Sequence, residues 1–261
     1  MKKFFAVPLA AIFVAACSES STAPVSDLNP SYAKPVDPIV VCADCPIVGD
    51  FTFEGGTTVS AAAGSTIGTE LQTGAAGVAD APTVVTAPLG DQQFLGRFEN
   101  TRTMVVINAP GSTNYYLNFD LYIIGSWDGR GKQAQQGAFL ANVVEIGWRC
   151  TDGTSGTLLK TTFSNQYTVQ QDYPNSYLTG GYKAGTGSVA IDALGYVDAP
   201  LLSHTPSFRS FGDATYDLTF SGSNPCGGAA VTFTISTSNP TQQSVYDESW
   251  GVDNIIVRAG T

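Results

Sequence analysis

The sequence is poor in positive charge. Twelve lysines and arginines face twenty-two aspartates and glutamates, which gives a formal net charge of -10. A protein that binds nucleic acid neutralises phosphates with clustered Lys and Arg side chains. Neither the overall balance nor any local cluster supplies such a basic surface. The composition therefore excludes nucleic acid as a partner.

Signs of catalysis are also scarce. His204 is the only histidine, so a centre built from several histidines is excluded, and no serine lies in a G-x-S-x-G motif. A retaining glycosidase needs two carboxylates roughly 5 Å apart in a cleft, and the closely alternating acidic triplet of the glucanases with a sandwich fold is missing. We therefore predict a protein that is not an enzyme, with a glycosidase as the less favoured alternative.

Long apolar runs are missing as well. The first residues, MKKFFAVPLAAIFVAAC, hold two lysines and about a dozen mostly apolar residues, too few to cross a bilayer as a helix. This pattern predicts an export signal peptide over residues 1–16. The ending VAAC resembles the lipobox of bacterial lipoproteins, with Val14 where leucine is usual. The resemblance implies that Cys17 is lipidated, whereas an ordinary secretory signal is the alternative.

A lipidated Cys17 would hold the protein on a membrane, because two or more acyl chains give stable anchoring. Ser18 follows the cysteine, which favours the outer membrane as the site within the bacterial cell envelope. Residues 17–47 are rich in Pro and Ser without periodicity, so they predict a flexible tether. Residues 48–261 are then the folded domain.

Four further cysteines lie outside the signal segment. Outside the cytoplasm four cysteines usually form two disulfides, and three pairings are possible. We predict Cys42 with Cys45 and Cys150 with Cys226. A redox pair at Cys42 and Cys45 is disfavoured because the Pro-rich stretch offers no adjacent strand and helix. A zinc site is disfavoured because the other two cysteines are not closely spaced.

Several segments alternate apolar and polar residues. In LNFDLYII, Leu117, Phe119, Leu121 and Ile123 share one side of a strand, whereas Asn118, Asp120 and Tyr122 share the other; YDLTF and VTFTI repeat the pattern. Turn-rich stretches such as APGSTN, WDGRG and TDGTSG separate these segments. The pattern predicts an all-β fold of two packed antiparallel sheets, with one polar face open to solvent or to a sugar.

Five motifs occur in an order that resembles a known group of domains. They are FLGRF (94–98), FDLYIIGSWDG (119–129), TTFSNQ (161–166), DYP (172–174) and DESWGVDNIIV (247–257). The chain from about Gly49 to Arg258 is similar to secreted bacterial jelly-roll domains that look like concanavalin A-like domains or carbohydrate-binding modules. The resemblance implies a jelly-roll sandwich. An acidic residue often precedes SWDG in that group, and Gly125 stands there in this chain.

The polar face and the SWDG motif supply candidate ligand-binding residues. Trp127 offers an aromatic surface for stacking on a sugar ring, and Asp128 offers an acceptor for its hydroxyls. Tyr122 and Asp120 offer the same chemistry on the neighbouring strand. The competing interpretation is structural, because Asp-Gly suits a tight turn over which the tryptophan packs.

The closing stretch suggests a metal site. In many jelly-roll binding modules the first and last strands are neighbours and calcium lies where they meet. Glu54, Asp253 and Asn254 carry the hard oxygen ligands that Ca²⁺ takes, so we predict a tentative structural calcium there. Otherwise Glu248 and Asp253 would satisfy backbone amides or pair with Arg97 or Arg258.

Together these patterns predict a membrane-anchored extracytoplasmic lipoprotein with a non-catalytic, carbohydrate-binding-like domain. Its partners would be the membrane, through the lipid anchor, and a glycan or other envelope component. The alternative is a structural or adhesive envelope protein without a small-molecule ligand.

Overall fold

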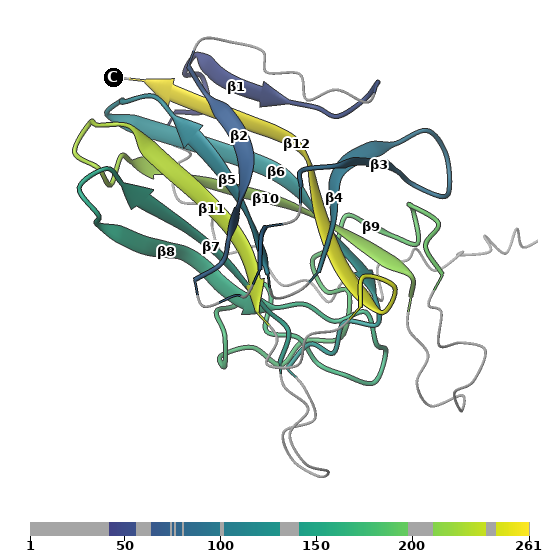
Figure 1. Cartoon of the computed structure of the whole chain (residues 1–261). Helices are drawn as coiled ribbons and strands as arrows, with labels where there is room; N and C mark the ends of the chain where they lie inside the picture. The colour runs from purple at the N-terminus through teal and green to yellow at the C-terminus, as the bar shows by residue number, and fades with distance from the viewer. Residues whose placement is uncertain are drawn as a thin grey trace, which may run out of the picture. The chain divides into compact units, whose positions relative to one another are not determined.

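A computed structural model of the chain (Figure 1) describes residues 42–55, 64–73, 75, 77–79, 81–99, 102–130, 141–197, 211–238 and 244–260. The predicted signal peptide, Cys17 and the tether up to residue 41 lie outside these residues, as does His204. Within the described part, no helix has the length and apolar character needed to span a membrane.

The described residues form twelve strands that alternate with turns. Their bounds are β1 Ile47–Phe51, β2 Thr66–Leu71, β3 Val84–Thr86, β4 Gln93–Glu99, β5 Thr103–Ala109, β6 Asn114–Gly125, β7 Val143–Cys150, β8 Ser155–Thr162, β9 Ala190–Ile191, β10 Asp213–Ser223, β11 Val231–Ser238 and β12 Glu248–Gly260.

The strands pair into two antiparallel sheets that pack face to face (Figure 1). The seven-stranded sheet has the order β3-β4-β12-β6-β10-β9, and β1 pairs with β12 beside this path. The five-stranded sheet has the order β2-β5-β11-β7-β8. The predicted fold class, an all-β antiparallel jelly-roll sandwich, is confirmed. β12 pairs with β1, β4 and β6, so it joins the C-terminal part of the chain to the N-terminal part.

The core lies between the sheets and follows the alternation seen in the sequence. Leu117, Phe119, Leu121 and Ile123 of β6 are all fully buried in one apolar cluster. Phe233 of β11 faces them from the other sheet, and its ring lies 5.0 Å from that of Tyr115. Because removing apolar area from water yields roughly 25 cal/mol per Å², this two-sided cluster holds the sheets together.

Both predicted disulfides are present. Cys42 pairs with Cys45, and Cys150 at the end of β7 pairs with Cys226 in the turn before β11, with Cα atoms 4.7 and 5.5 Å apart. The second bond closes a loop with a sequence separation of 76. The chain-entropy argument assigns such a loop about 4 kcal/mol of stabilisation.

The ordered fold begins before residue 48. Arg258 Nη1 donates to the Cys45 carbonyl over 3.1 Å, and the Ala259 amide donates to the Pro46 carbonyl over 3.2 Å. A side chain at Gly260 would lie 2.3 Å from Cys45 Sγ, so the small disulfide loop packs directly on β12. Residues 42–47, which the sequence assigns to the tether, therefore belong to the sandwich.

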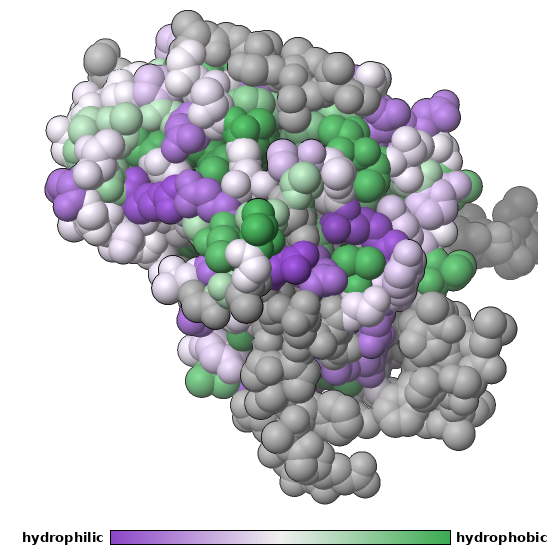
Figure 2. Space-filling model, in the orientation of Figure 1, coloured by the Kyte–Doolittle hydropathy of each residue, from purple (hydrophilic) through white to green (hydrophobic). Residues whose placement is uncertain are grey.

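Figure 2 shows hydrophilic and hydrophobic residues mixed over one face of the molecule in the orientation of Figure 1. The half-exposed positions of β6, among them Asn118 and Asp120, alternate with its buried core residues and therefore lie on the outer face of the seven-stranded sheet.

Candidate functional site

Trp127 is a core residue. Its side chain is fully buried, and Nε1 donates to the Ser249 carbonyl over 2.9 Å. The expectation of an exposed stacking surface at Trp127 is therefore wrong. The residue continues the inward-facing odd positions of β6 past Gly125, so its indole fills the end of the sandwich.

Asp128 beside it serves the same local structure. Its Oδ1 accepts a hydrogen bond from Gln166 Nε2, and residue 128 bridges to Ser164. Gln166 also donates to the Ser126 carbonyl over 3.0 Å. The SWDG motif is thereby fastened to the TFSNQ motif, which is the structural interpretation rather than a sugar acceptor on a free loop.

Tyr122 lies on the outer face as its even position predicts, but it is fully buried. It belongs to a second apolar cluster, whose other members are Ala87, Phe94, Ile124 and Leu194. The Phe94 and Tyr122 rings meet edge to face at 5.0 Å. The predicted open platform at Tyr122 is therefore wrong, because a distant loop folds over its ring.

That covering loop is fastened by a buried carboxylate. Asp213 accepts hydrogen bonds from the amides of Leu194 and Tyr196 over 3.0 and 3.1 Å. Burial raises the pKa of Asp213, and these amide bonds act against the rise. The loop holds Leu194 against the Tyr122 ring. Only the Tyr122 hydroxyl therefore contacts the polar residues of this face.

Three aspartates lie in register across adjacent strands beside Tyr122. Asp217 of β10 stands opposite Asp120 of β6, and Asp120 stands opposite Asp253 of β12. We call these three residues the aspartate row. Like charges that face each other across strands destabilise a sheet. Such a row is costly in a sheet whose only task is to fold.

Neutral groups satisfy the aspartate row. Asn118 Nδ2 donates to Asp217 Oδ1 over 2.5 Å, and Asn254 Nδ2 donates to Asp120 Oδ2 over 2.8 Å. The Tyr122 hydroxyl lies 3.2 Å from Asp253 Oδ2 and also contacts Gln92 Nε2. The described ion pairs are Arg130 with Asp172, Arg149 with Glu70 and Lys160 with Glu145, so none of them neutralises the row.

A bulge in β12 brings Asn254 to this face. The register with β6 shifts between Asp253 and Ile256, and Asn254 takes a φ of 51°. Asparagine tolerates this left-handed region better than most residues. The Asn254 amide N–H donates to Asp253 Oδ1 over 2.8 Å while its side chain reaches Asp120. One residue therefore organises two members of the row.

The electrostatics of the row follow from burial and from its neighbours. Burial raises the pKa of Asp253 to about 6, with a further contribution from Glu54 and despite the hydrogen bonds that the carboxylate accepts. Burial also raises the pKa of Asp120, to which Asp217 adds. Both shifts reflect the cost of placing negative charge at this face of the sheet.

The residues predicted to bind calcium come together only in part. Asp253 and Asn254 are adjacent in the bulge, and Glu54 accepts the Gln93 amide over 3.3 Å at the start of β4. In the part of the chain that the structure describes, no three acidic, histidine or cysteine side chains are arranged to hold a metal ion. The calcium site stays a prediction.

The alternative pairing with arginine does not occur. Arg97 Nε donates to Ser249 Oγ over 2.9 Å, and Arg258 Nη1 donates to a backbone carbonyl. Asp253 instead uses the neutral donors described above. This difference leaves both the arginines and the aspartate row with charge that no opposite charge in the described residues matches.

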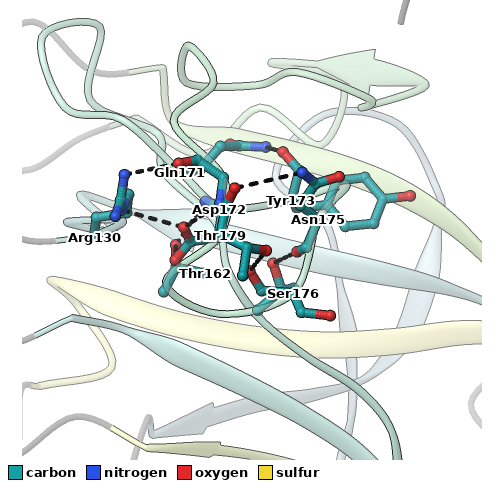
Figure 3. Close-up of polar contacts among 10 residues, drawn as sticks. Arg130, Thr162, Gln171, Asp172, Tyr173, Asn175, Ser176 and Thr179 are labelled. Carbon is teal, nitrogen blue, oxygen red and sulfur yellow. Dashed lines mark hydrogen bonds and ion pairs between the residues drawn. The ribbon is translucent and has the colours of Figure 1, made fainter. Parts of the chain in front are cut away.

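A different aspartate forms a closed network between β8 and β9 (Figure 3). Asp172 is fully buried and pairs with Arg130 Nε over 3.2 Å, and it accepts bonds from Thr162 Oγ1 and the Gly180 amide over 3.1 and 3.0 Å. Gln171 next to it accepts the amides of Ser164 and Gly185, both over 3.1 Å. These groups fix a long connection and enclose Asp172 away from solvent.

Comparisons with known proteins add little to the site. No model of a known protein family matches the chain, and no curated protein matches it. The K3 cleaved adhesin domain of Lys-gingipain from Porphyromonas gingivalis W83 is similar over 82% of this chain and 100% of that one, with 10% identity and a TM-score of 0.39. The K1 domain of the same protein covers 81% and 98%, with 10% identity and a TM-score of 0.38.

A third similar structure is the enzymatically active domain of tailspike protein 4 from bacteriophage CBA120. It covers 74% of this chain but 19% of that one, with 9% identity and a TM-score of 0.27. At such identities and TM-scores these likenesses carry no argument about function. The function has to be inferred from the aspartate row itself.

Proposed function

We propose that the chain is a non-catalytic protein of the bacterial cell envelope, and that it binds carbohydrate through the aspartate row. The observation that carries the proposal is the register of Asp217, Asp120 and Asp253 on three neighbouring strands. A sheet that only folds would place opposite charges or small polar residues there. Instead three carboxylates stand side by side, and the partners that they have among the described residues are neutral donors.

The chemistry of the row suits a polyhydroxylated ligand. Carboxylates accept hydrogen bonds from sugar hydroxyls, and charge-assisted bonds of this kind are stronger than neutral ones. Asn118 and Asn254 offer both donors and acceptors beside them. Asp217 is exposed and Asp120 is half-exposed, whereas Asp253 is buried, so the first two are the members of the row that can contact a ligand. One strand spacing, about 5 Å, separates them.

A glycan array tests the proposal. The full chain is expected to bind a defined subset of glycans, and Asp120→Asn with Asp217→Asn is expected to abolish that binding while the thermal midpoint is kept. Glu145→Gln on β7 of the other sheet is the matched control, because it also removes an exposed carboxylate. Glycan binding that survives in the double variant would contradict the proposal. Binding to no glycan would favour the structural or adhesive alternative.

Calcium is a second candidate ligand of the same face. The raised pKa of Asp253, the nearby Glu54 charge and the adjacent amide oxygens favour a divalent cation. If calcium binds, a chelator will lower the thermal midpoint of the native chain, and Asp253→Asn will remove that response. An unchanged midpoint in the native chain would eliminate calcium.

The membrane anchor is a separate proposal that rests on the sequence around Cys17. We expect metabolic labelling with a fatty-acid alkyne to mark the native chain, and Cys17→Ser to abolish both the label and the membrane association. Label that persists in Cys17→Ser would place the acyl group elsewhere, and native chain without label would favour an ordinary secretory signal.

A further inference from the structure

The guanidinium of Arg97 lies on the outer face, next to the second apolar cluster. The Arg97 guanidinium lies over the ring of Tyr196, with Cζ 4.7 Å from the ring centroid. Tyr196 in turn packs edge-on against Phe94 at 6.4 Å. A chain of aromatic contacts thus runs from Tyr122, beside the aspartate row, to Arg97 of β4.

Arg97 has no carboxylate partner among the described residues. Its Nε donates to Ser249 Oγ over 2.9 Å, and its Nη2 donates to the Val245 carbonyl. A guanidinium carries five N–H donors in a planar fork, so three remain after these two bonds. The side chain is half-buried, and burial lowers the pKa of Arg97. Within the described residues this partly desolvated cation therefore has no carboxylate partner, although acidic residues outnumber basic ones in the sequence.

An exposed tyrosine flanks this cation. Tyr246 is 75% exposed, and it contributes with Tyr196 to the electrostatic environment of Arg97. Hydrogen bonds hold the turn that carries it: the Asp247 amide donates to the Ser244 carbonyl over 2.9 Å, and the Ser126 amide donates to the Asp247 carbonyl over 2.8 Å. The bond from Arg97 to Val245 fixes the same turn. The aromatic ring is therefore presented to solvent from a fastened backbone.

We propose that Arg97, Tyr196 and Tyr246 form a binding site for the carboxylate of an acidic sugar. The two outer nitrogens of the guanidinium donate to the carboxylate, and the sugar ring packs against Tyr246. Tyr196 acts as a positioning residue, because its ring supports the guanidinium from below. This site is separate from the aspartate row: it presents a cation where the row presents carboxylates, and the proposal does not depend on binding at the row.

Topology favours a glycan over an acidic peptide. A peptide that binds a sheet in extended form needs an edge strand whose backbone groups are open. Arg97 lies on β4, which has β3 on one side and β12 on the other. The pairing with β3 ends at Leu95, and the register with β12 shifts beside Arg97. Only the residues of β4 after Leu95 lack a β3 partner, and this stretch is too short for an extended peptide to add as a strand. A guanidinium next to an exposed ring needs no backbone contact to hold a uronic acid.

The experiment measures the affinity of the full chain, purified in detergent, for three acidic probes: trigalacturonate, a hyaluronate tetrasaccharide and sialyllactose. The methyl ester of the best ligand is the matched control, because it removes only the negative charge. At least one acid is expected to bind, with its ester about tenfold weaker or more. Arg97→Gln is expected to abolish this difference, whereas Arg149→Gln on the other sheet keeps it.

Tyr246→Ala keeps the test decisive if Arg97→Gln fails to fold, because Tyr246 is exposed and its removal leaves the core intact. It is expected to weaken the acid about three- to tenfold. Asp120→Asn separates this site from the aspartate row and is expected to leave the preference for acid over ester unchanged. Binding to none of the three acids, equal affinity for acid and ester, or capture of acidic peptides alone would overturn the proposal.

Discussion

The aspartate row and the network around Asp172 satisfy the same side chain in opposite ways. Asp172 is enclosed by Arg130, Thr162 and a backbone amide, so its charge is matched and three of its acceptor positions are used. In the row, Asp217 is exposed, Asp120 is half-exposed and Asp253 is buried, and all three have amide and hydroxyl partners only. Asp172 is therefore committed to the fold, whereas Asp217 and Asp120 have no cation partner among the described residues and lie where a ligand can reach them.

The largest effect is expected from Asp172→Ala. The substitution removes Asp172, the fully buried partner of the ion pair with Arg130. It also leaves Thr162 Oγ1 and the Gly180 amide without their acceptor. Breaking a buried pair of this kind costs about 3 kcal/mol or more. Urea unfolding measures the loss, and Glu145→Ala, which breaks an exposed pair, is expected to cost about 0.5 kcal/mol or less. Equal losses in the two variants would remove the contrast on which the comparison rests.

A smaller, pH-dependent effect is expected from Asp253. Its pKa of about 6 in the folded state lies above the ordinary aspartate value near 3.9, so between these values the folded state binds more protons. The contribution is fully present below about pH 4 and is lost as pH rises through about 6. With allowance for solvent screening we expect about 1–2 kcal/mol.

Asp253→Asn should remove this pH dependence, as measured by unfolding free energies at pH 4.5 and pH 7.5 in chelator. The variant keeps the shape of the side chain but does not titrate. If native chain and variant lose the same stability between the two pH values, another group is responsible.

The smallest effect on stability is expected from Asp217→Asn. The side chain is exposed, and the substitution relieves repulsion with Asp120 while an amide still pairs with Asn118. We expect a change within about 0.5 kcal/mol, in the stabilising direction. A loss above 1 kcal/mol in urea unfolding would show that the row serves the fold.

Much of the fold follows from the sequence because alternation reports which side of a strand is buried. The alternation places Leu117, Phe119 and Leu121 on one side of a strand, and that side faces the core. The same alternation of odd and even positions predicts that Trp127 is buried, whereas the SWDG motif suggests an exposed sugar platform. The periodic signal was the better guide, since it reflects the packing of the whole sandwich.

The site was harder to predict because it depends on which strands are neighbours. Asp120 and Asp253 were both candidates, but for different ligands, and Asp217 was missed although its outward position is visible in YDLTF. Only the pairing of β10, β6 and β12 brings the three together. The cover over Tyr122 comes from Leu194, which is remote in sequence, so no local pattern announces it.

The affinity of the best array glycan for the native chain and for the variant that carries Asp120→Asn and Asp217→Asn tests the central claim most directly. Two charge-assisted acceptors are lost, so we predict at least about tenfold weaker binding, with an unfolding free energy within about 0.5 kcal/mol of the native value. Equal affinity in the two proteins would contradict a role for the aspartate row in binding.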